Sequence, residues 1–273
     1  MQPPSNLGAF RVILSKYART SSLQEAPAQH QDTRSLNYDG RSPVWGQFSR
    51  PRDFRSPSKI GPDIALRATP LGGGIKRCFD LTLALTTIIL MAPTLLLITA
   101  MIYITMGRPI FFVQQRVGFG RKQFGCLKFR TMVTDADEKL AAYLSENPDA
   151  ALMWQEKQKL THDPRITWLG HILRKSSLDE TPQLFNVLVG HMSCIGPRPV
   201  LPDELRRYGA HERIYAKARP GLTGMWQISG RSSTTYAQRV LCDCYYIRRW
   251  SLALDAAILL KTVPAVMKFD ETA

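Results

Sequence analysis

One uncharged stretch limits what this chain can become. Residues 81–107 contain no Asp, Glu, Lys or Arg and are mostly apolar. About 20 apolar residues are enough for a helix to cross a bilayer, so the stretch predicts a membrane helix. Pro93 lies near its middle, where a proline removes a backbone donor and clashes with the preceding turn. We therefore expect a kink at this position.

The basic residues on either side indicate how this helix meets the membrane. Lys76 and Arg77 precede it, and Arg108 and Arg116 follow it. Basic residues beside membrane segments prefer the cytoplasm, so a helix that is broken at Pro93 and returns to its own face places both groups correctly. This predicts a re-entrant helix over residues 75–108. A plain spanning anchor that tolerates its proline stays open.

The membrane helix divides the chain into three segments. Residues 1–70 hold eight of the 18 prolines and show no sustained apolar periodicity. Such a composition cannot bury enough apolar surface to offset its ordering entropy, so residues 1–74 are predicted to be a disordered basic tail that ends in a glycine hinge. Residues 109–273 then form a cytoplasmic domain.

The pattern of this domain predicts an α+β fold that is mostly helical. Two β-rich runs, 109–118 and 123–132, flank a Gly-containing turn and read as a hairpin. Thr134 is expected to cap a helix that ends at Asn147, before a second helix over about 149–160. Residues 166–173 have apolar side chains at helical spacing. The apolar segment 250–269 has an aromatic and basic border, which suits an interfacial helix or a buried core helix.

The net charge of +14 calls for a polyanionic partner. Nucleic acid, an anionic membrane surface and a phosphorylated substrate all satisfy this requirement. We expect no nucleic-acid partner, because the chain lacks aromatic-studded strands and a recognisable reading helix. Five widely spaced cysteines indicate reduced thiols rather than a disulfide framework, and the Cys242/Cys244 pair has no evident function.

Two adjacent carboxylates are the best candidates for chemistry. If Thr181 is a helix cap, Pro182 becomes the first helical residue, its preferred place. Asp179 and Glu180 then lie just ahead of a helix N-terminus, where free amides and the helix dipole attract anions. A carboxylate there can stay ionised beside a phosphate and attack phosphorus. Simple compensation of the helix dipole is the alternative.

Basic residues that close the hairpin, precede the acidic pair or stand beside rigid proline or flexible glycine support a phosphate site. Arginine grips phosphate with two parallel hydrogen bonds, and a stiff loop lowers the entropy lost on binding. The predicted phosphate-binding residues are Lys128, Arg130, Arg174, Arg198, Arg219 and Arg231.

An ordered set of motifs covers roughly residues 75–268. It comprises Lys76-Arg77-Cys78-Phe79-Asp80, Lys128-Phe129-Arg130-Thr131-Met132, Asp163-Pro164-Arg165-Ile166-Thr167, Ser177-Leu178-Asp179-Glu180, Gly196-Pro197-Arg198-Pro199, Arg219-Pro220-Gly221-Leu222-Thr223-Gly224, Trp226-Gln227, Gly230-Arg231 and Tyr245-Tyr246. This set resembles the bacterial sugar transferases, the monotopic phosphoglycosyl transferases that charge polyprenol phosphate. Within that family the chain is most similar to short exopolysaccharide-initiating galactosyl-phosphate transferases, including the insert at Glu146–Lys159.

The resemblance implies a reaction and its residues. Asp179 would attack the β-phosphorus of a UDP-sugar, releasing UMP and leaving an aspartyl phosphosugar that undecaprenyl phosphate then accepts. Glu180 would bind Mg²⁺. The transferred hexose stays open, with UDP-galactose or UDP-glucose preferred, and so does homo-oligomer formation. The resemblance places the chain in a bacterial inner (cytoplasmic) membrane, with residues 109–273 as its catalytic domain on the cytoplasmic face and with membrane lipids as further partners.

Two points qualify what the resemblance implies. Ala92 stands before Pro93 where relatives often carry Ser, which removes a hydroxyl that could bond the broken backbone. A non-enzymatic membrane adaptor that binds anionic lipid is the alternative function. It would explain the charge and the apolar segment, but it would not explain the ordered motifs.

Overall fold

The computed structural model describes residues 69–157, 160, 162–229 and 235–267. The predicted tail, residues 1–74, lies outside this range except for its last residues. The described part is mostly helical, with two small two-stranded sheets, so the α+β prediction is confirmed.

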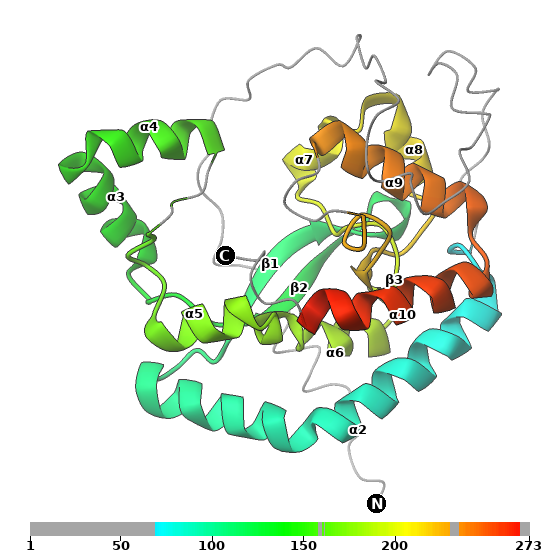
Figure 1. Ribbon diagram of the computed structural model, residues 1–273, viewed down its shortest axis with the longest axis horizontal. Coiled ribbons are helices and arrows are strands. Elements are labelled where there is room, and N and C mark those ends of the chain that lie inside the picture. Colours follow the sequence, from blue (N-terminus) through cyan, green and yellow to red (C-terminus); the bar gives the residue numbers. More distant parts are fainter. Residues whose placement is uncertain (1–68, 158–159, 161, 230–234, 268–273) are drawn as a thin grey trace, which may run out of the picture.

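The predicted membrane helix is present as α2 (Gly73–Met106), which begins two residues earlier than expected. Gly72 and Gly73 have positive φ angles of 78° and 54°, a backbone region that suits glycine and that turns the chain into the helix. Pro93 lies inside α2, which continues through it as one helix. Figure 1 shows that α2 changes direction part-way along its length.

Both halves of α2 pack against the same body of the protein. In the first half, Ala84 belongs to a core that also contains α6 (Gln183–Leu188) and α10 (Leu252–Met267). In the second half, Ile98 and Ile102 pack with Phe129 in a separate core. The opposite side of the helix is bare, since 11% of its most apolar stretch is buried and leucines and isoleucines between positions 85 and 104 are exposed. Among the described residues, α2 is the one helix long and apolar enough to cross a membrane.

The predicted hairpin is confirmed. Strands β1 (Phe111–Val117) and β2 (Gln123–Phe129) pair antiparallel, with Phe112 opposite Lys128. The turn between them contains the short helix η4 (Phe119–Arg121). This register brings Lys128 to the end of the hairpin that lies near the acidic turn.

A second sheet was not predicted from the sequence. Strands β3 (Ser193–Ile195) and β4 (Gly221–Thr223) pair in parallel. The strands approach closely because two glycines meet: a Cβ atom added to Gly221 would come within 2.1 Å of the backbone nitrogen of Gly196. The pairing fixes the loop that carries Arg198 against the loop that carries Trp226.

Helices α3 (Ala136–Glu146) and α4 (Pro148–Lys157) contact each other and stand away from the body (Figure 1). The prediction that Thr134 caps α3 is wrong, because the cap position is Asp135 and it makes no side-chain cap bond. Helix α5 (Trp168–Lys175) is capped at its N-terminus by Thr167, whose hydroxyl accepts from the backbone N–H of Gly170.

The remaining helices complete the domain and surround the β3–β4 sheet. They are α7 (Pro202–Arg206), η6 (Gly209–His211), α8 (Glu212–Tyr215), α9 (Tyr236–Arg249) and α10. The last of these, α10, corresponds to the apolar segment predicted at 250–269. Ile258 is fully buried and Leu260 is 74% exposed, so α10 has one face in the core and one face uncovered.

A buried polar network joins the start of α2 to the C-terminal helices. The ammonium group of Lys76 lies 2.7 Å from Asp255 Oδ2, and both side chains are almost completely buried. Tyr246 donates its hydroxyl to Asp255 Oδ1 at 2.7 Å, and the Trp250 indole N–H donates to Oδ2 at 3.0 Å. The Asp255 carboxylate therefore accepts from three donors. This ion pair and these hydrogen bonds join α2 to α9 and α10, in addition to their packing.

Candidate active site

The acidic pair lies in a tight turn just before α6. Ser177 has a left-handed φ of 57° and precedes the short helix η5 (Leu178–Glu180). The predicted cap at Thr181 is wrong: Thr181 is itself helical, its hydroxyl donates to the carbonyl of Leu178, and Pro182 occupies the position before α6. The position ahead of a helix was therefore correct for both carboxylates, although the turn differs from the one expected.

Asp179 is a buried carboxyl group, with 8% of its surface exposed. Its pKa is raised from 3.8 to about 6, chiefly by burial and also by the neighbouring Glu180 carboxylate, while Lys128 and Arg174 oppose the rise. A carboxylate with such a pKa is ionised near neutral pH and more basic than an ordinary aspartate, which suits a nucleophile.

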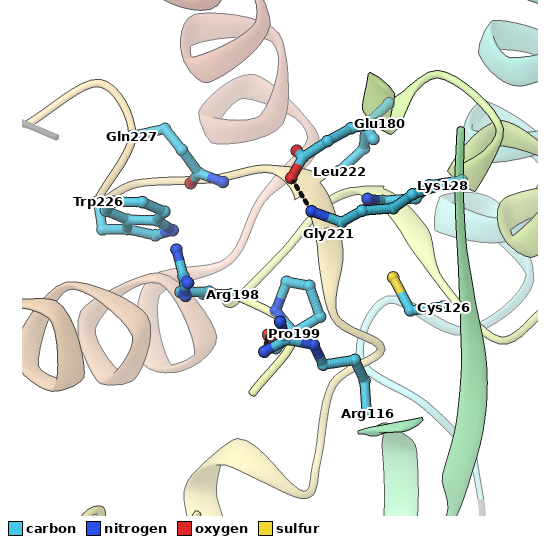
Figure 2. A pocket seen from close by; sticks show the side chains of 11 residues that line it. Arg116, Cys126, Lys128, Glu180, Arg198, Pro199, Gly221, Leu222, Trp226 and Gln227 are labelled. Atoms are coloured by element: carbon cyan, nitrogen blue, oxygen red, sulfur yellow. Dashed lines mark hydrogen bonds and ion pairs between the residues drawn. The ribbon is translucent and has the colours of Figure 1, made fainter. Parts of the chain in front are cut away.

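Glu180 faces the hairpin and pairs with Lys128. The ammonium group lies 2.6 Å from Glu180 Oε1, and the two side chains are 24% and 43% exposed. Strand β2 supplies the lysine and the η5 turn supplies the glutamate, so the pair joins segments far apart in the sequence. Figure 2 shows this pair at one side of a pocket.

The pocket is open and rich in cationic side chains. It is lined by Arg116, Cys126, Lys128, Glu180, Gln183, Arg198, Pro199, Gly221, Leu222, Trp226 and Gln227. Three of these carry a positive charge and one a negative charge, so the site suits an anionic ligand. Asp179 is next to Glu180 in the chain but does not line the pocket, and its side chain is buried.

Arg198 is positioned by a buried polar cluster. Its backbone N–H donates to Asp243 Oδ2 at 3.3 Å, and its carbonyl lies 3.0 Å from the Tyr215 hydroxyl. Tyr208 donates to the same oxygen of Asp243 at 2.8 Å. Burial raises the pKa of Asp243 to about 7, against the effect of these hydrogen bonds. The guanidinium group lies 5.0 Å from the centre of the Trp226 ring, within cation–π range.

Arg174 lies on the buried side of the acidic turn. Its Nε donates to Thr131 Oγ1 at 2.9 Å. Burial lowers the pKa of the guanidinium, and the negative charges of Asp179 and Asp163 oppose that effect. Arg174 thus supplies positive charge to Asp179 from outside the pocket.

The structure places two other predicted phosphate ligands at helix ends. Arg130 donates to the carbonyls of Met106 and Gly107 at the end of α2. Arg219 donates to the carbonyl of Gly190, just after α6. Cations are favourable at helix C-termini, where carbonyls lack partners. Neither arginine lines the pocket, and Arg231 lies outside the described residues.

A sequence model of the bacterial sugar transferase family matches residues 72–269. This range includes the hairpin, the acidic turn and the whole pocket. The chain belongs to the bacterial sugar transferase family. The predicted resemblance is confirmed, and the chain is an enzyme of the phosphoglycosyl transferase type.

Several curated members of the bacterial sugar transferase family resemble the chain over most of its length. The exopolysaccharide production protein ExoY of Rhizobium meliloti is 45% identical over 80% of this chain and 96% of its own length. The UDP-galactose-lipid carrier transferase of Erwinia amylovora is 47% identical over 72% of this chain and 41% of its own. The undecaprenyl-phosphate galactose phosphotransferase of Salmonella typhimurium is 45% identical over the same shares.

Reasoning from the sequence missed part of this sugar transferase pocket. Arg116 was noted only as a flank of the membrane helix, yet it lines the pocket and donates to the Pro199 carbonyl at 3.1 Å. Trp226 and Gln227 appeared only as part of the family motifs. Gln183 and Cys126 had no signal at all, since an amide and a lone thiol have no functional spacing that a single sequence can reveal.

The donor set is consistent with Mg²⁺ held by one protein carboxylate. Among the described residues, no three His, Cys, Asp or Glu side chains gather in one place. Mg²⁺ in phosphate-transferring enzymes is often held by one or two carboxylates with water and substrate oxygens. Glu180 is half-exposed at the pocket and fits that role. In this structure its carboxylate forms an ion pair with Lys128.

Proposed function

We propose that this enzyme transfers a hexose-1-phosphate from a UDP-sugar to undecaprenyl phosphate. The observation that carries the proposal is the pocket: an acidic turn with a buried carboxyl of raised pKa borders a cavity lined by Arg116, Lys128 and Arg198. The names of the relatives agree with it, since they include galactose and glucose phosphotransferases acting on undecaprenyl phosphate. We therefore propose galactose or glucose as the hexose.

In the first step Asp179 acts as the nucleophile. One carboxylate oxygen forms a bond to the β-phosphorus, and the bond from that phosphorus to the oxygen bridging to the α-phosphate breaks. The electron pair leaves with UMP, and the hexose phosphate stays on the aspartate as an acyl phosphate. Lys128 and Arg198 balance the charge that develops on the phosphate oxygens.

In the second step the lipid phosphate takes the place of UMP. An oxygen of undecaprenyl phosphate attacks the same phosphorus, the bond to Asp179 breaks, and the carboxylate is restored. The products are UMP and a lipid diphosphate sugar. The buried position of Asp179 limits access of water, which would otherwise hydrolyse the acyl phosphate.

Glu180 would hold Mg²⁺ when donor is bound. The ion would neutralise pyrophosphate charge and stabilise the leaving group. Lys128 then changes partner, because the substrate phosphates offer it more negative charge than one carboxylate does. Chelation with EDTA should abolish UMP release and added Mg²⁺ should restore it, whereas full activity in chelator would contradict the metal role.

The packing of α2 also supports a re-entrant helix, which we propose lies at the cytoplasmic face of the bacterial inner membrane. Ala84 in the first half of α2 and Ile102 in the second half both pack on the one catalytic domain. A straight spanning helix would carry its second half away from that domain. The exposed apolar side between these contacts would face lipid.

The transferase activity is tested by UMP release from a panel of UDP-sugars with undecaprenyl phosphate, using membranes that contain the full chain. UDP-galactose or UDP-glucose should give UMP and a lipid-linked product. With a UDP-sugar labelled on its hexose and without added undecaprenyl phosphate, the label should remain bound to the wild-type protein. It should be absent from the Asp179→Asn variant. Release of no UMP from any donor would favour the lipid-binding adaptor.

The topology is tested by labelling single cysteines introduced at positions 58 and 123 in a cysteine-free background. Both positions should react only from the cytoplasmic side. Labelling from opposite sides would show that α2 spans the bilayer. Retained UMP release in the cysteine-free protein is the control that the fold is intact.

A further inference from the structure

Three residues that line the pocket each carry a buried polar atom with no hydrogen-bond partner among the described residues. The atoms are the indole Nε1 of Trp226, the side-chain oxygen Oε1 of Gln227 and the guanidinium Nε of Arg198. A buried polar atom without a partner is destabilising, so such atoms are normally bonded within the protein or reserved for a ligand. Three of them on residues that line one cavity indicate a ligand.

The indole ring of Trp226 is held in place by two arginines. The guanidinium groups of Arg198 and Arg239 lie 5.0 and 5.1 Å from its centre. Gln227 is the next residue, and a Cβ atom added to Gly224 would lie 3.1 Å from its Oε1. These side chains are therefore positioned before a ligand arrives, which lowers the entropy cost of binding.

The three atoms form a set of two donors and one acceptor. Trp226 and Arg198 offer N–H groups, and Gln227 offers a carbonyl oxygen. The complementary ligand edge is an N–H group with carbonyl oxygens beside it, which is an imide. Uracil has this edge: its N3–H donates, and O2 and O4 accept. Cytosine presents a lone pair at N3 and an amino group at C4, which is the opposite pattern.

We propose that Trp226 and Gln227 recognise the uracil ring of the nucleotide donor. Gln227 Oε1 accepts from N3–H, and Trp226 Nε1 donates to one of the adjacent carbonyls. Figure 2 shows the two residues at one side of the pocket with Arg198 beside Trp226, and the Lys128–Glu180 pair at the other side. This arrangement allows a base at the first side and phosphates beside the cations. The inference rests on the proposed function and adds the residues that set its nucleotide specificity.

The first measurement is binding of nucleoside monophosphates to the detergent-solubilised full chain. Binding is detected as protection of the protein against thermal unfolding. UMP should protect at concentrations about 10- to 100-fold lower than CMP or N3-methyl-UMP, because these lack the imide N–H and leave Gln227 unpaired. Equal protection by UMP and N3-methyl-UMP would overturn the proposal. A Gln227 amide rotated by half a turn would present its NH₂ group and favour CMP, which would overturn it as well.

The second measurement uses variants that each remove one hydrogen-bonding group, either the Gln227 acceptor or the Trp226 donor. Gln227→Ala should weaken UMP binding and bring the UMP to N3-methyl-UMP ratio close to one, since the acceptor is lost and room for the methyl group appears. Trp226→Phe keeps a ring beside both arginines but removes the N–H, and should weaken UMP about 10-fold. The matched controls are Gln123→Ala and Trp168→Phe, at exposed positions outside the pocket, which should leave UMP binding unchanged.

UMP release separates the failure of this inference from failure of the proposed function. If wild-type enzyme transfers from UDP-sugars but Gln227→Ala keeps full discrimination between UMP and N3-methyl-UMP, the base is read elsewhere and only this inference fails. If wild-type enzyme neither binds UMP nor uses any UDP-sugar, the proposed function fails first. Weakened UMP binding together with an increase in KM for the UDP-sugar supports both.

Discussion

Two lysine–carboxylate pairs in this protein have nearly the same geometry and opposite surroundings. Lys76 and Asp255 lie 2.7 Å apart with side chains 6% and 0% exposed. Lys128 and Glu180 lie 2.6 Å apart with side chains 24% and 43% exposed. The first pair joins the membrane helix α2 to α10, and the second lies at the rim of the pocket.

The difference lies in what else each carboxylate binds. Asp255 also accepts hydrogen bonds from Tyr246 and Trp250, so its oxygens are fully used. Glu180 pairs with Lys128 through one oxygen, and its side chain is 43% exposed to solvent. A buried pair held in this way cannot exchange partners without a large desolvation cost, whereas an open pair can. The same chemistry is therefore an anchor in one region and an exchangeable contact in the other.

The largest expected effect is on the pocket side, at the acidic turn. Asp179→Asn keeps the shape of the side chain but removes the attacking charge, so turnover should fall by at least ~10³. Folded stability should not fall, because the neutral amide no longer carries the cost of burying a charge. UMP release and thermal unfolding of the purified variant measure the two quantities. Turnover equal to that of wild type would exclude Asp179 as the nucleophile.

On the anchor side, Lys76→Met should lower the free energy of unfolding by about 3–5 kcal/mol, because it leaves Asp255 buried without its counter-charge. The amount of folded protein in membranes and its unfolding temperature in detergent measure this effect. Lys128→Met is the matched control, since the same substitution at the exposed pair should change stability by less than about 1 kcal/mol. Similar losses in both variants would show that burial does not separate the two pairs.

The same Lys128→Met variant should impair the reaction instead. Loss of a phosphate-binding ammonium group should raise KM for the UDP-sugar or lower kcat by about 10- to 100-fold. Steady-state UMP release over a range of donor concentrations gives both constants. An unchanged kcat/KM would show that Lys128 serves Glu180 alone.

The smallest expected effect is a shift in pH dependence. Because burial raises the pKa of Asp179 to about 6 and the nucleophile must be ionised, turnover should fall as the pH is lowered through 6. The positive charge of Lys128 lowers this pKa, so Lys128→Met should move the acid limb of the profile to higher pH. Profiles of kcat/KM between pH 5 and 8 would show this, and an acid limb that moves to lower pH would contradict it.

The same carboxyl also links pH to stability. The folded-state pKa of Asp179 is raised above 3.8, so the folded protein keeps a proton that the unfolded chain has already lost. Its contribution to stability is therefore present below about pH 3.8 and is lost as the pH rises through 6. Asp179→Asn should remove this part of the pH dependence of unfolding.

The hairpin, the membrane helix and the acidic turn could all be predicted because each depends on local signals. Alternating β-formers around a glycine turn specify the hairpin, and an uncharged apolar run specifies α2. Pro182 marks the start of a helix even though the cap itself was misassigned. Residues 1–68 of the predicted disordered tail, and Arg231, lie outside the described residues and stay predictions, whereas Gly73 and Gly74 at the end of that tail belong to α2.

The groups that the arginine side chains contact could not be predicted in the same way. Arg219 stands in the same kind of Pro- and Gly-rich setting as Arg198, and Arg130 closes the hairpin beside Lys128, yet both arginines bind carbonyls at the ends of α6 and α2. A guanidinium group binds a phosphate or a free helix carbonyl with similar geometry. Which of the two it meets depends on segments more than twenty residues away in the chain.

The sequence by itself determined the family, the long apolar helix α2 and the place of the two carboxylates just ahead of α6, because apolar runs, proline and glycine act on their immediate neighbours. Only the tertiary structure decided which side chains share the pocket. The parallel pairing of β3 and β4 brings Arg198 to Trp226, and the hairpin register brings Lys128 to Glu180. The tertiary structure also decided how far each group is buried, and burial is what makes Asp255 an anchor and gives Asp179 a pKa of about 6.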